Sequence, residues 1–215
     1  KHTFSFASYY NENRMDFGML RVLNDDIVEC GMGFGKHSHN NMEIVSIPLA
    51  GALEHKDSMG HVEVIKEGEV QIMSAGTGVM HSEYNHSKTE DVNFLQIWVL
   101  PKERNIKPRY DKRNIKDVDK KNKFLTVVSP DKNDNAVWIN QDAYFSLAKI
   151  DIDTEISYDM KLKGNGVYLF VIEGDVTIDG NELRRRDGIG IEEIDIVTIK
   201  SNSESYLLAI EVPRE

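Results

Sequence analysis

Two short stretches of the chain decide which fold and which site to expect. One is Gly31-Met-Gly-Phe-Gly-Lys-His37-Ser-His39, and the other is His81-Ser-Glu83. In each stretch two polar residues stand at i and i+2, and such side chains point to the same face of a β-strand. Two such strands lying side by side would direct four ligands, His37, His39, His81 and Glu83, at one point.

This set of ligands has a definite chemical preference. Three imidazoles and one carboxylate suit Fe²⁺, Mn²⁺, Ni²⁺, Co²⁺, Cu²⁺ or Zn²⁺, and the lack of thiolate disfavours a structural zinc site. Four protein ligands leave two octahedral positions open for substrate or dioxygen. The competing interpretation is a set of surface or hydrogen-bonded histidines. A single His-x-His pair is more often of that kind, whereas two pairs in separate strand-like segments favour a metal site.

The rest of the chain is typical of an all-β protein. Apolar runs of strand length occupy residues 94–100, 144–152, 167–172 and 206–212, and the pair Asp179-Gly180 predicts a hairpin turn. No long stretch keeps a helical apolar stripe. Many short strands with glycine-containing turns indicate a sandwich or a small barrel.

Charge divides the chain into three parts. Residues 1–101 carry 7 basic and 14 acidic side chains, residues 102–123 carry 10 and 4, and residues 124–215 carry 9 and 18. The basic stretch 102–123 lacks both strong periodicities, so we expect it to be a linker between two similar domains. All seven histidines precede residue 87, so the second domain cannot reproduce the site of the first.

Composition excludes several other classes of protein. The 215 residues are 40% hydrophobic and 29% charged, as in ordinary globular domains, and no run approaches the ~20 apolar residues of a membrane helix. Cys30 is the single cysteine, which excludes an internal disulfide and suits a reducing cytoplasm. A formal net charge of −10 argues against direct nucleic-acid binding. The sequence begins at Lys1, so we expect further residues upstream.

Motifs along the whole chain resemble those of one family. The spacing Gly31-x5-His37-x-His39-x3-Glu43 is similar to the first cupin motif, and Gly78-x2-His81-x3-Asn85 is similar to the end of the second. The chain is identified as similar to the pirins, in particular to bacterial pirin-like quercetinases. The segments that carry this resemblance are residues 2–7, 20–26, 54–60, 71–78, 81–85 and 96–98.

The resemblance implies a bicupin, that is, two facing β-barrel or jelly-roll domains with one mononuclear metal in the N-terminal domain. The implied ligands are His37, His39, His81 and Glu83, and the implied metal is usually iron. Three positions depart from the general cupin pattern. Gly76 stands where proline is common, and Gly51 lies one residue later than the standard spacing of the first motif. Glu43 occupies the place of the usual carboxylate ligand, yet on an extended strand it would lie about 13 Å from His39.

We therefore expect Glu43 in the pocket wall and Glu83 as the carboxylate ligand. His55, Met73 and Phe34 are weaker candidates for the surroundings of the pocket. For each of them an ordinary core or hydrogen-bonded role is the competing interpretation.

Three functions remain open from the sequence. The first is a metal-dependent dioxygenase that cleaves a flavonol such as quercetin, in which the metal lowers the pKa of the substrate hydroxyl and Glu83 accepts its proton. The second is a metal-binding regulatory protein, because pirins are also described as transcription cofactors and as partners of enzymes. The third is an enzyme that acts on another small enol or aromatic substrate.

Overall fold

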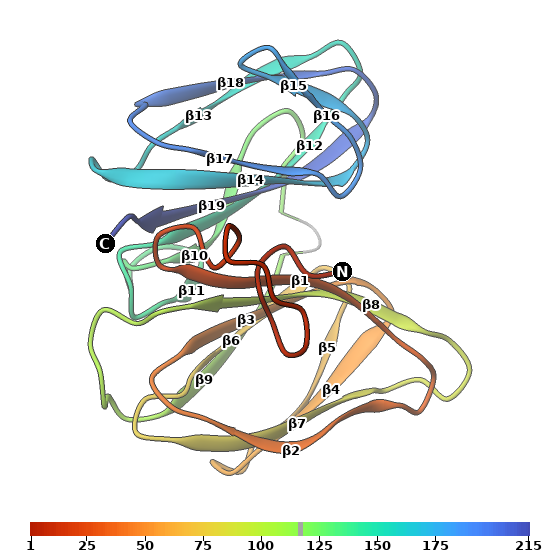
Figure 1. The fold of residues 1–215 in the computed structure, drawn as a ribbon. Helices are drawn as coiled ribbons and strands as arrows, with labels where there is room; N and C mark the ends of the chain where they lie inside the picture. The colour runs from red at the N-terminus through yellow and green to blue at the C-terminus, as the bar shows by residue number, and fades with distance from the viewer. Residues whose placement is uncertain (116–117) are drawn as a thin grey trace. The chain divides into compact units, whose positions relative to one another are not determined.

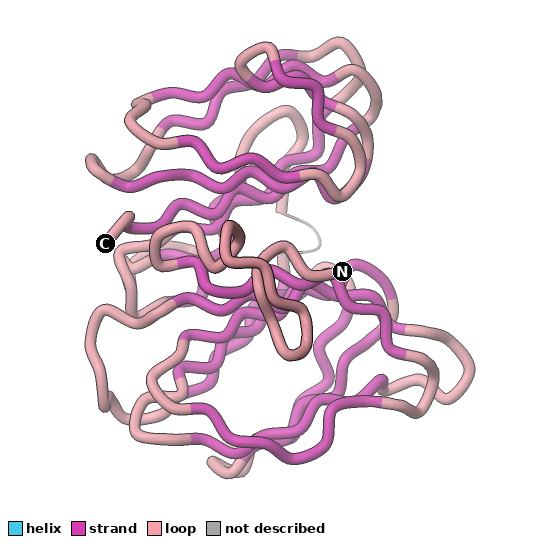
Figure 2. The backbone as a smooth tube through the Cα atoms, in the orientation of Figure 1, coloured by secondary structure: helices cyan, strands magenta, loops and turns pink. Residues whose placement is uncertain are grey.

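The computed structural model of the chain describes residues 1–115 and 118–215. These residues form strands and loops but no helix (Figure 2), which confirms the all-β prediction. They also include no helix of the length and apolarity needed to cross a membrane. The chain divides into two compact units, Lys1–Asp117 with Val137–Gln141, and Val118–Ala136 with Asp142–Glu215.

The first unit is a sandwich of two antiparallel sheets (Figure 1). One sheet has the strand order β1-β8-β3-β6-β9, and the other has the order β2-β7-β4-β5. The bounds of the strands in this unit are β1 (Leu20–Val28), β2 (Gly33–His39), β3 (Glu43–Ala50), β4 (Ala52–Asp57), β5 (Val62–Lys66), β6 (Glu69–Ser74), β7 (Val79–Asn85), β8 (Val92–Val99), β9 (Arg109–Asn114) and β11 (Val137–Trp138).

Apolar side chains in register across the larger sheet build the core of this unit. Val45 of β3 lies opposite Ile97 of β8 and Ile72 of β6, and Ile47 lies opposite Leu95. All five are buried. Rows of β-branched and leucine side chains in this arrangement stabilise a sheet through cross-strand contacts. The larger sheet therefore supplies the hydrophobic core of the first unit.

The second unit also consists of two antiparallel sheets. In the larger one β10, β12, β19, β14 and β17 follow one another, and the smaller has the order β13-β18-β15-β16. The bounds are β10 (Leu125–Ser129), β12 (Tyr144–Ile150), β13 (Glu155–Asp159), β14 (Asn165–Glu173), β15 (Val176–Ile178), β16 (Asn181–Leu183), β17 (Gly188–Ile191), β18 (Ile196–Ser201) and β19 (Ser205–Pro213). One apolar cluster, which includes Tyr158, Leu169 and Leu207, fills the space between its sheets.

The predicted strands are confirmed. The apolar runs at 94–100, 144–152, 167–172 and 206–212 fall on β8, β12, β14 and β19. The hairpin at Asp179-Gly180 joins β15 to β16, and both turn residues have positive φ, 46° and 79°, as a type I′ turn requires.

The stretch expected to be a linker contains a strand. Arg109–Asn114 forms β9, which pairs with β6 along its whole length at the edge of the larger sheet. An edge strand can carry many charged side chains, which protect it from pairing with other chains. For that reason β9 shows no apolar alternation in the sequence. Residues 116 and 117 of the expected linker lie outside the described residues.

Candidate metal centre

The alternation of polarity along β7 is the reverse of that in an ordinary amphipathic strand. Its buried side chains include His81, Glu83 and Asn85, whereas the apolar Met80 and Tyr84 are exposed. Burying polar groups is costly unless they are hydrogen-bonded or bind a ligand. This strand therefore places chemical groups, rather than packing groups, inside the sandwich.

The strands on either side of β7 place further polar residues opposite His81 and Glu83. His37 of β2 lies opposite His81, and on the other side of β7 His55 and Asp57 of β4 lie opposite Glu83 and His81. In Figure 1 β2 and β7 lie side by side in the first unit. The two sequence motifs thus meet on adjacent strands, as their spacing predicted.

A β-bulge in β2 determines which residues meet. Phe34 lies opposite Glu83, but the register shifts by one residue before His37. With an unbroken register His37 would lie opposite Met80, whose side chain is on the exposed face. The bulge moves the pairing to His81, because an extra residue on one strand reverses the faces that follow it.

Three imidazole rings form a tight cluster at this point. The ring centroids of His37 and His81 are 4.4 Å apart, those of His37 and His39 4.8 Å, and those of His39 and His81 4.9 Å. The Nε2 atoms of His37 and His81 are 3.0 Å apart. Among the described residues, the ligand atoms of these three side chains all lie within 4.8 Å of one another.

The protonation of the cluster suits a cation. His37 Nδ1 donates to the Gly35 carbonyl oxygen at 2.8 Å, which leaves the lone pair of its Nε2 directed at the cluster. Burial lowers the pKa of His39 to about 4 and that of His81 to about 3, with the neighbouring histidines adding to the effect. Neutral imidazoles with free lone pairs are the form that binds metal.

Glu83 is a fully buried carboxylate held by neutral donors. Gln96 Nε2 donates to its Oε2 at 2.6 Å, and Gln71 Nε2 and Ser46 Oγ donate to its Oε1 at 3.2 and 3.3 Å. Burial raises the pKa of Glu83 to about 7, although these hydrogen bonds act in the opposite direction. Its oxygen lies with ligand atoms of His55 and His81 in a second group within 4.8 Å, among the residues that the structure describes.

The chemistry of these donors fits a divalent first-row metal. Nε2 of His39 is buried and has no hydrogen-bond partner within the described part of the chain, which is costly for a polar atom unless it binds something. Imidazole nitrogens and one carboxylate suit Fe, Mn, Ni, Co, Cu and Zn alike. The residues present would therefore hold such an ion, and His81 is shared by both groups of ligand atoms.

Two weaker candidates, Glu43 and Phe34, lie outside the histidine cluster. Glu43 does not continue the strand of His37 and His39, because the chain turns at Asn41, which has φ 47°. Instead Glu43 begins β3 in the opposite sheet, where its Oε2 accepts hydrogen bonds from Ser74 Oγ at 2.7 Å and Asn140 N at 3.1 Å. Phe34 is exposed, so it is not a core residue.

The remaining candidates line the surroundings of the cluster. Met73 is buried in an apolar cluster with Ile44 and Val79, against which Trp98 packs. The ring of Trp98 lies 4.8 Å from that of His39. His55 is fully buried, and its Nε2 lies 3.1 Å from Asp57 Oδ2.

Sequence reasoning missed several residues of this centre. Gln71, Gln96 and Ser46 hold Glu83, yet each stands within an apolar strand where nothing in the local pattern marks it. Tyr110 lies in the expected linker, but its ring stacks on His55 at 4.9 Å. Only the pairing of β9 with β6 brings Tyr110 to this place.

One departure from the motif pattern has a local structural cause. Gly76, which stands where proline is common, has φ 47°. A Cβ atom there would come within 2.1 Å of the Ile106 carbonyl oxygen. Proline cannot adopt positive φ, so this turn excludes it.

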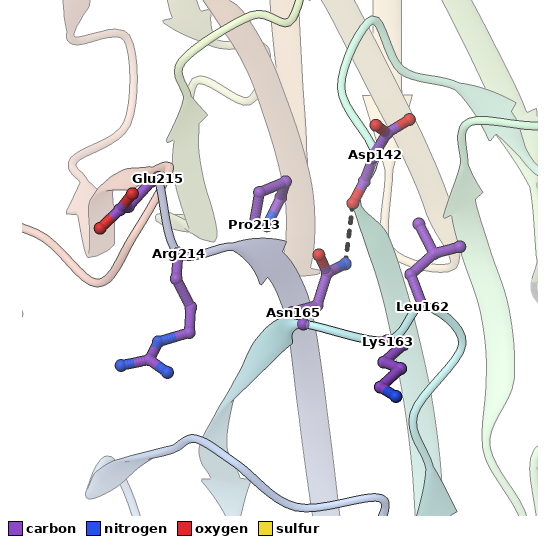
Figure 3. Close-up of a pocket in the computed structure, with 8 residues that line it drawn as sticks. Asp142, Leu162, Lys163, Asn165, Pro213, Arg214 and Glu215 are labelled. Carbon is purple, nitrogen blue, oxygen red and sulfur yellow. Dashed lines mark hydrogen bonds between the residues drawn. The ribbon is translucent and has the colours of Figure 1, made fainter.

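A hollow in the second unit offers less chemistry. It has a volume of about 640 Å³ and is lined by residues that include Asp142, Lys163 and Asn165 (Figure 3). Arg214 at its edge is paired with Glu192 and Glu193, and Asn165 Nδ2 donates to the Asp142 carbonyl oxygen. None of the residues that line it is a histidine, a cysteine or a serine, so it has no set of ligands or nucleophile comparable to the first unit.

Fold and site together define a cupin, a β-sandwich with a histidine cluster on its inner face. Residues 1–99 match the family model described as Pirin, and residues 126–212 match that of the quercetinase C-terminal cupin domain. The chain belongs to the pirin family.

Relatives of known name cover almost the whole chain. Quercetin 2,3-dioxygenase of Escherichia coli K12 is 42% identical over 212 residues, which are 99% of this chain and 90% of the relative. A pirin-like protein of Caulobacter vibrioides is 36% identical over 98% of this chain and 90% of its own length. The crystal structure of the bacterial pirin YhhW from E. coli in complex with nickel(II) matches with a TM-score of 0.93 and 40% identity, and covers 100% of this chain and 91% of that one.

Proposed function

We propose that this chain is a metal-dependent dioxygenase of the quercetin 2,3-dioxygenase type, which cleaves a flavonol with dioxygen and releases carbon monoxide. The observation that carries the proposal is the convergence of the three imidazoles of His37, His39 and His81 beside the buried Glu83 carboxylate; His81 is fully buried, and His37 is partly buried. The 42% identity to a quercetin 2,3-dioxygenase over 99% of the chain supports it.

The residues that would hold the ion are His37, His39, His81 and Glu83, and we propose iron as the most suitable metal, with Mn, Ni, Co, Cu and Zn as alternatives. A bound divalent ion would supply Lewis acidity that lowers the pKa of the flavonol 3-hydroxyl. A nickel-bound pirin among the solved structures supports a divalent metal.

Glu83 is the residue suited to accept the proton of that hydroxyl at a carboxylate oxygen. Burial raises the pKa of Glu83 to about 7 in the metal-free site, and a buried carboxylate is a stronger base than an exposed one. Gln71, Gln96 and Ser46 hold this carboxylate in place through hydrogen bonds to both of its oxygens.

Aromatic groups beside the cluster suit a planar substrate. The ring of Trp98 lies edge-on to that of His39 at 4.8 Å and to that of Phe6 at 5.3 Å. Trp98 and Phe6 are both partly exposed, so they would offer apolar surface to an aromatic ring and help to exclude water.

The two halves of the chain have different roles in this proposal. The first unit, which contains the expected domain of residues 1–101, is the metal-binding domain in this proposal. The second unit, which contains most of residues 124–215, is a degenerate cupin without a metal site, since it has no histidine. We also propose that the protein acts in the cytoplasm on a small aromatic substrate, without a membrane or nucleic-acid partner.

Single alanine variants test the proposal. His37→Ala, His39→Ala and His81→Ala should each lose bound metal and quercetin-dependent oxygen uptake. His86→Ala is the matched control, because the side chain of His86 is exposed and pairs with Glu54 at the surface. Oxygen uptake that survives in all three cluster variants would refute this site. Metal binding without turnover of quercetin or of other flavonols would favour a regulatory role.

A further inference from the structure

A second polar chain starts at His81 and leads away from the three-histidine cluster. Asp57 Oδ2 lies 3.1 Å from His55 Nε2 and 2.9 Å from His61 Nδ1. The side chains of His55 and Asp57 are both fully buried, and the ring of His55 is 5.4 Å from that of His81. Glu83 lies beside His55 in the strand pairing.

Asp57 is fixed rigidly in this chain. Besides the two histidines, its Oδ1 accepts hydrogen bonds from the backbone N–H groups of Met59 at 2.8 Å and His61 at 3.1 Å. Burial alone would raise the pKa of Asp57, but these hydrogen bonds outweigh it and lower the pKa. Asp57 is therefore ionised, and both of its oxygens act only as hydrogen-bond acceptors.

This carboxylate selects one tautomer of His55. Because a carboxylate accepts, the proton of His55 must lie on Nε2, and Nδ1 then carries the lone pair. His55 Nδ1 is buried and has no partner among the described residues. The stacked ring of Tyr110 on one face holds the imidazole in this plane.

Within residues 1–115 and 118–215, His81 lacks an acceptor for the proton on its ring, whereas His55 has a free lone pair. If its Nε2 faces the cation beside His37, the proton lies on Nδ1, and that atom is also buried without a partner in the described residues. Imidazoles that bind metal almost always donate their other N–H to an acceptor, which sets the ring orientation and raises the ligand's basicity. For His37 this acceptor is the Gly35 carbonyl oxygen.

We propose that His55, oriented by Asp57, is the acceptor that positions His81 for metal binding. The inference rests on the proposed function, because it takes His81 as a ligand. His55 and Asp57 are positioning residues: the chain Asp57–His55–His81 fixes the proton of His81 on Nδ1 and leaves Nε2 free for the metal. The lone pair on His55 Nδ1 and the proton on His81 Nδ1 are complementary, and with ring centroids 5.4 Å apart one water between them would complete the chain when the ion is bound.

Metal affinity of the full chain, measured for Ni²⁺ by competition with a chelator, tests this proposal. His55→Leu should still bind one ion but with an affinity reduced by about 10- to 100-fold. His55→Gln should recover most of this loss, because its amide can accept from His81 and donate to Asp57. Asp57→Asn should resemble His55→Leu, since an amide can impose the wrong tautomer on His55. The Ni²⁺ absorption bands should shift in the same order, which a merely structural role would not produce.

The controls separate the possible failures. His86→Ala should bind Ni²⁺ like the wild type, and thermal unfolding of the metal-free variants shows whether His55→Leu and His55→Gln are folded alike. Wild-type affinity in His55→Leu would overturn the positioning role alone. Two ions per wild-type chain, with one lost in His55→Leu, would also overturn it, since His55 would then be a ligand itself. A wild-type chain that binds no metal would refute the proposed function and this inference with it.

Discussion

Glu83 and Glu43 are two buried carboxylates of the same unit with different surroundings. Glu83 lies beside the histidine cluster and is held by three neutral donors. Glu43 lies at the start of β3 and bonds to Ser74 and Asn140. Both were singled out in the sequence, but only the structure shows that the chain carries them into different sheets. The two residues therefore form a natural matched pair for mutation.

We expect Glu83→Gln to reduce flavonol turnover by about 10²- to 10⁴-fold, the usual contribution of a general base. Glutamine keeps the size of the side chain and one hydrogen-bond acceptor but cannot take a proton. Steady-state oxygen uptake at saturating quercetin measures the effect. Turnover within a factor of about three of the wild type would contradict the role of Glu83.

We expect Glu43→Gln to change the pH dependence of stability. Burial raises the pKa of Glu43 from 4.5 to about 7, so the folded state binds a proton more tightly than the unfolded state does. Stability from this group is therefore present below pH 4.5 and is lost as the pH rises to about 7, by up to about 3 kcal/mol. In the metal-free protein, urea unfolding between pH 4.5 and 7 should show a smaller decrease of unfolding free energy for Glu43→Gln than for the wild type. An equal decrease of unfolding free energy in Glu43→Gln and in the wild type would contradict this role of Glu43.

At the scale of the elements, the pairing of β2 with β7 decides the site. The i, i+2 spacing of both motifs could be recognised in the sequence, because strand geometry alone places such side chains on one face. The bulge between Phe34 and His37 could not, because it depends on which residue of β7 each residue of β2 meets. The same reason explains why Tyr110 was missed: an edge strand rich in charge has no apolar alternation.

We expect the close contact of β2 with β7 to be sensitive to one methyl group. A Cβ at Gly33 would lie 2.4 Å from the Glu83 carbonyl oxygen, whereas one at Gly35 meets nothing nearer than Tyr84 Oη at 3.9 Å. Gly33→Ala should therefore push the strands apart, reduce stability by about 1–3 kcal/mol and weaken metal binding. Gly35→Ala is its control and should change neither. Thermal unfolding and metal titration of the two variants measure the difference, and equal effects would contradict this account of the pairing.

At the scale of the whole molecule, the chain combines two units of similar construction and different chemistry. Each has two antiparallel sheets, but all the histidines lie in the first half of the sequence. This division was evident from the sequence, because the positions of the histidines can be read from it directly. Where the first unit ends was not evident, because β9 and residues 137–141 belong to it although the charge pattern suggested otherwise.

We expect the first unit to hold one divalent first-row metal and to use it on a flavonol. The most direct test is anaerobic metal analysis of the purified protein, followed by oxygen uptake and carbon monoxide detection when quercetin is added. We predict about one divalent ion per chain, with uptake and carbon monoxide that disappear after chelation. A metal-loaded protein that takes up no oxygen with quercetin or related flavonols would contradict the claim.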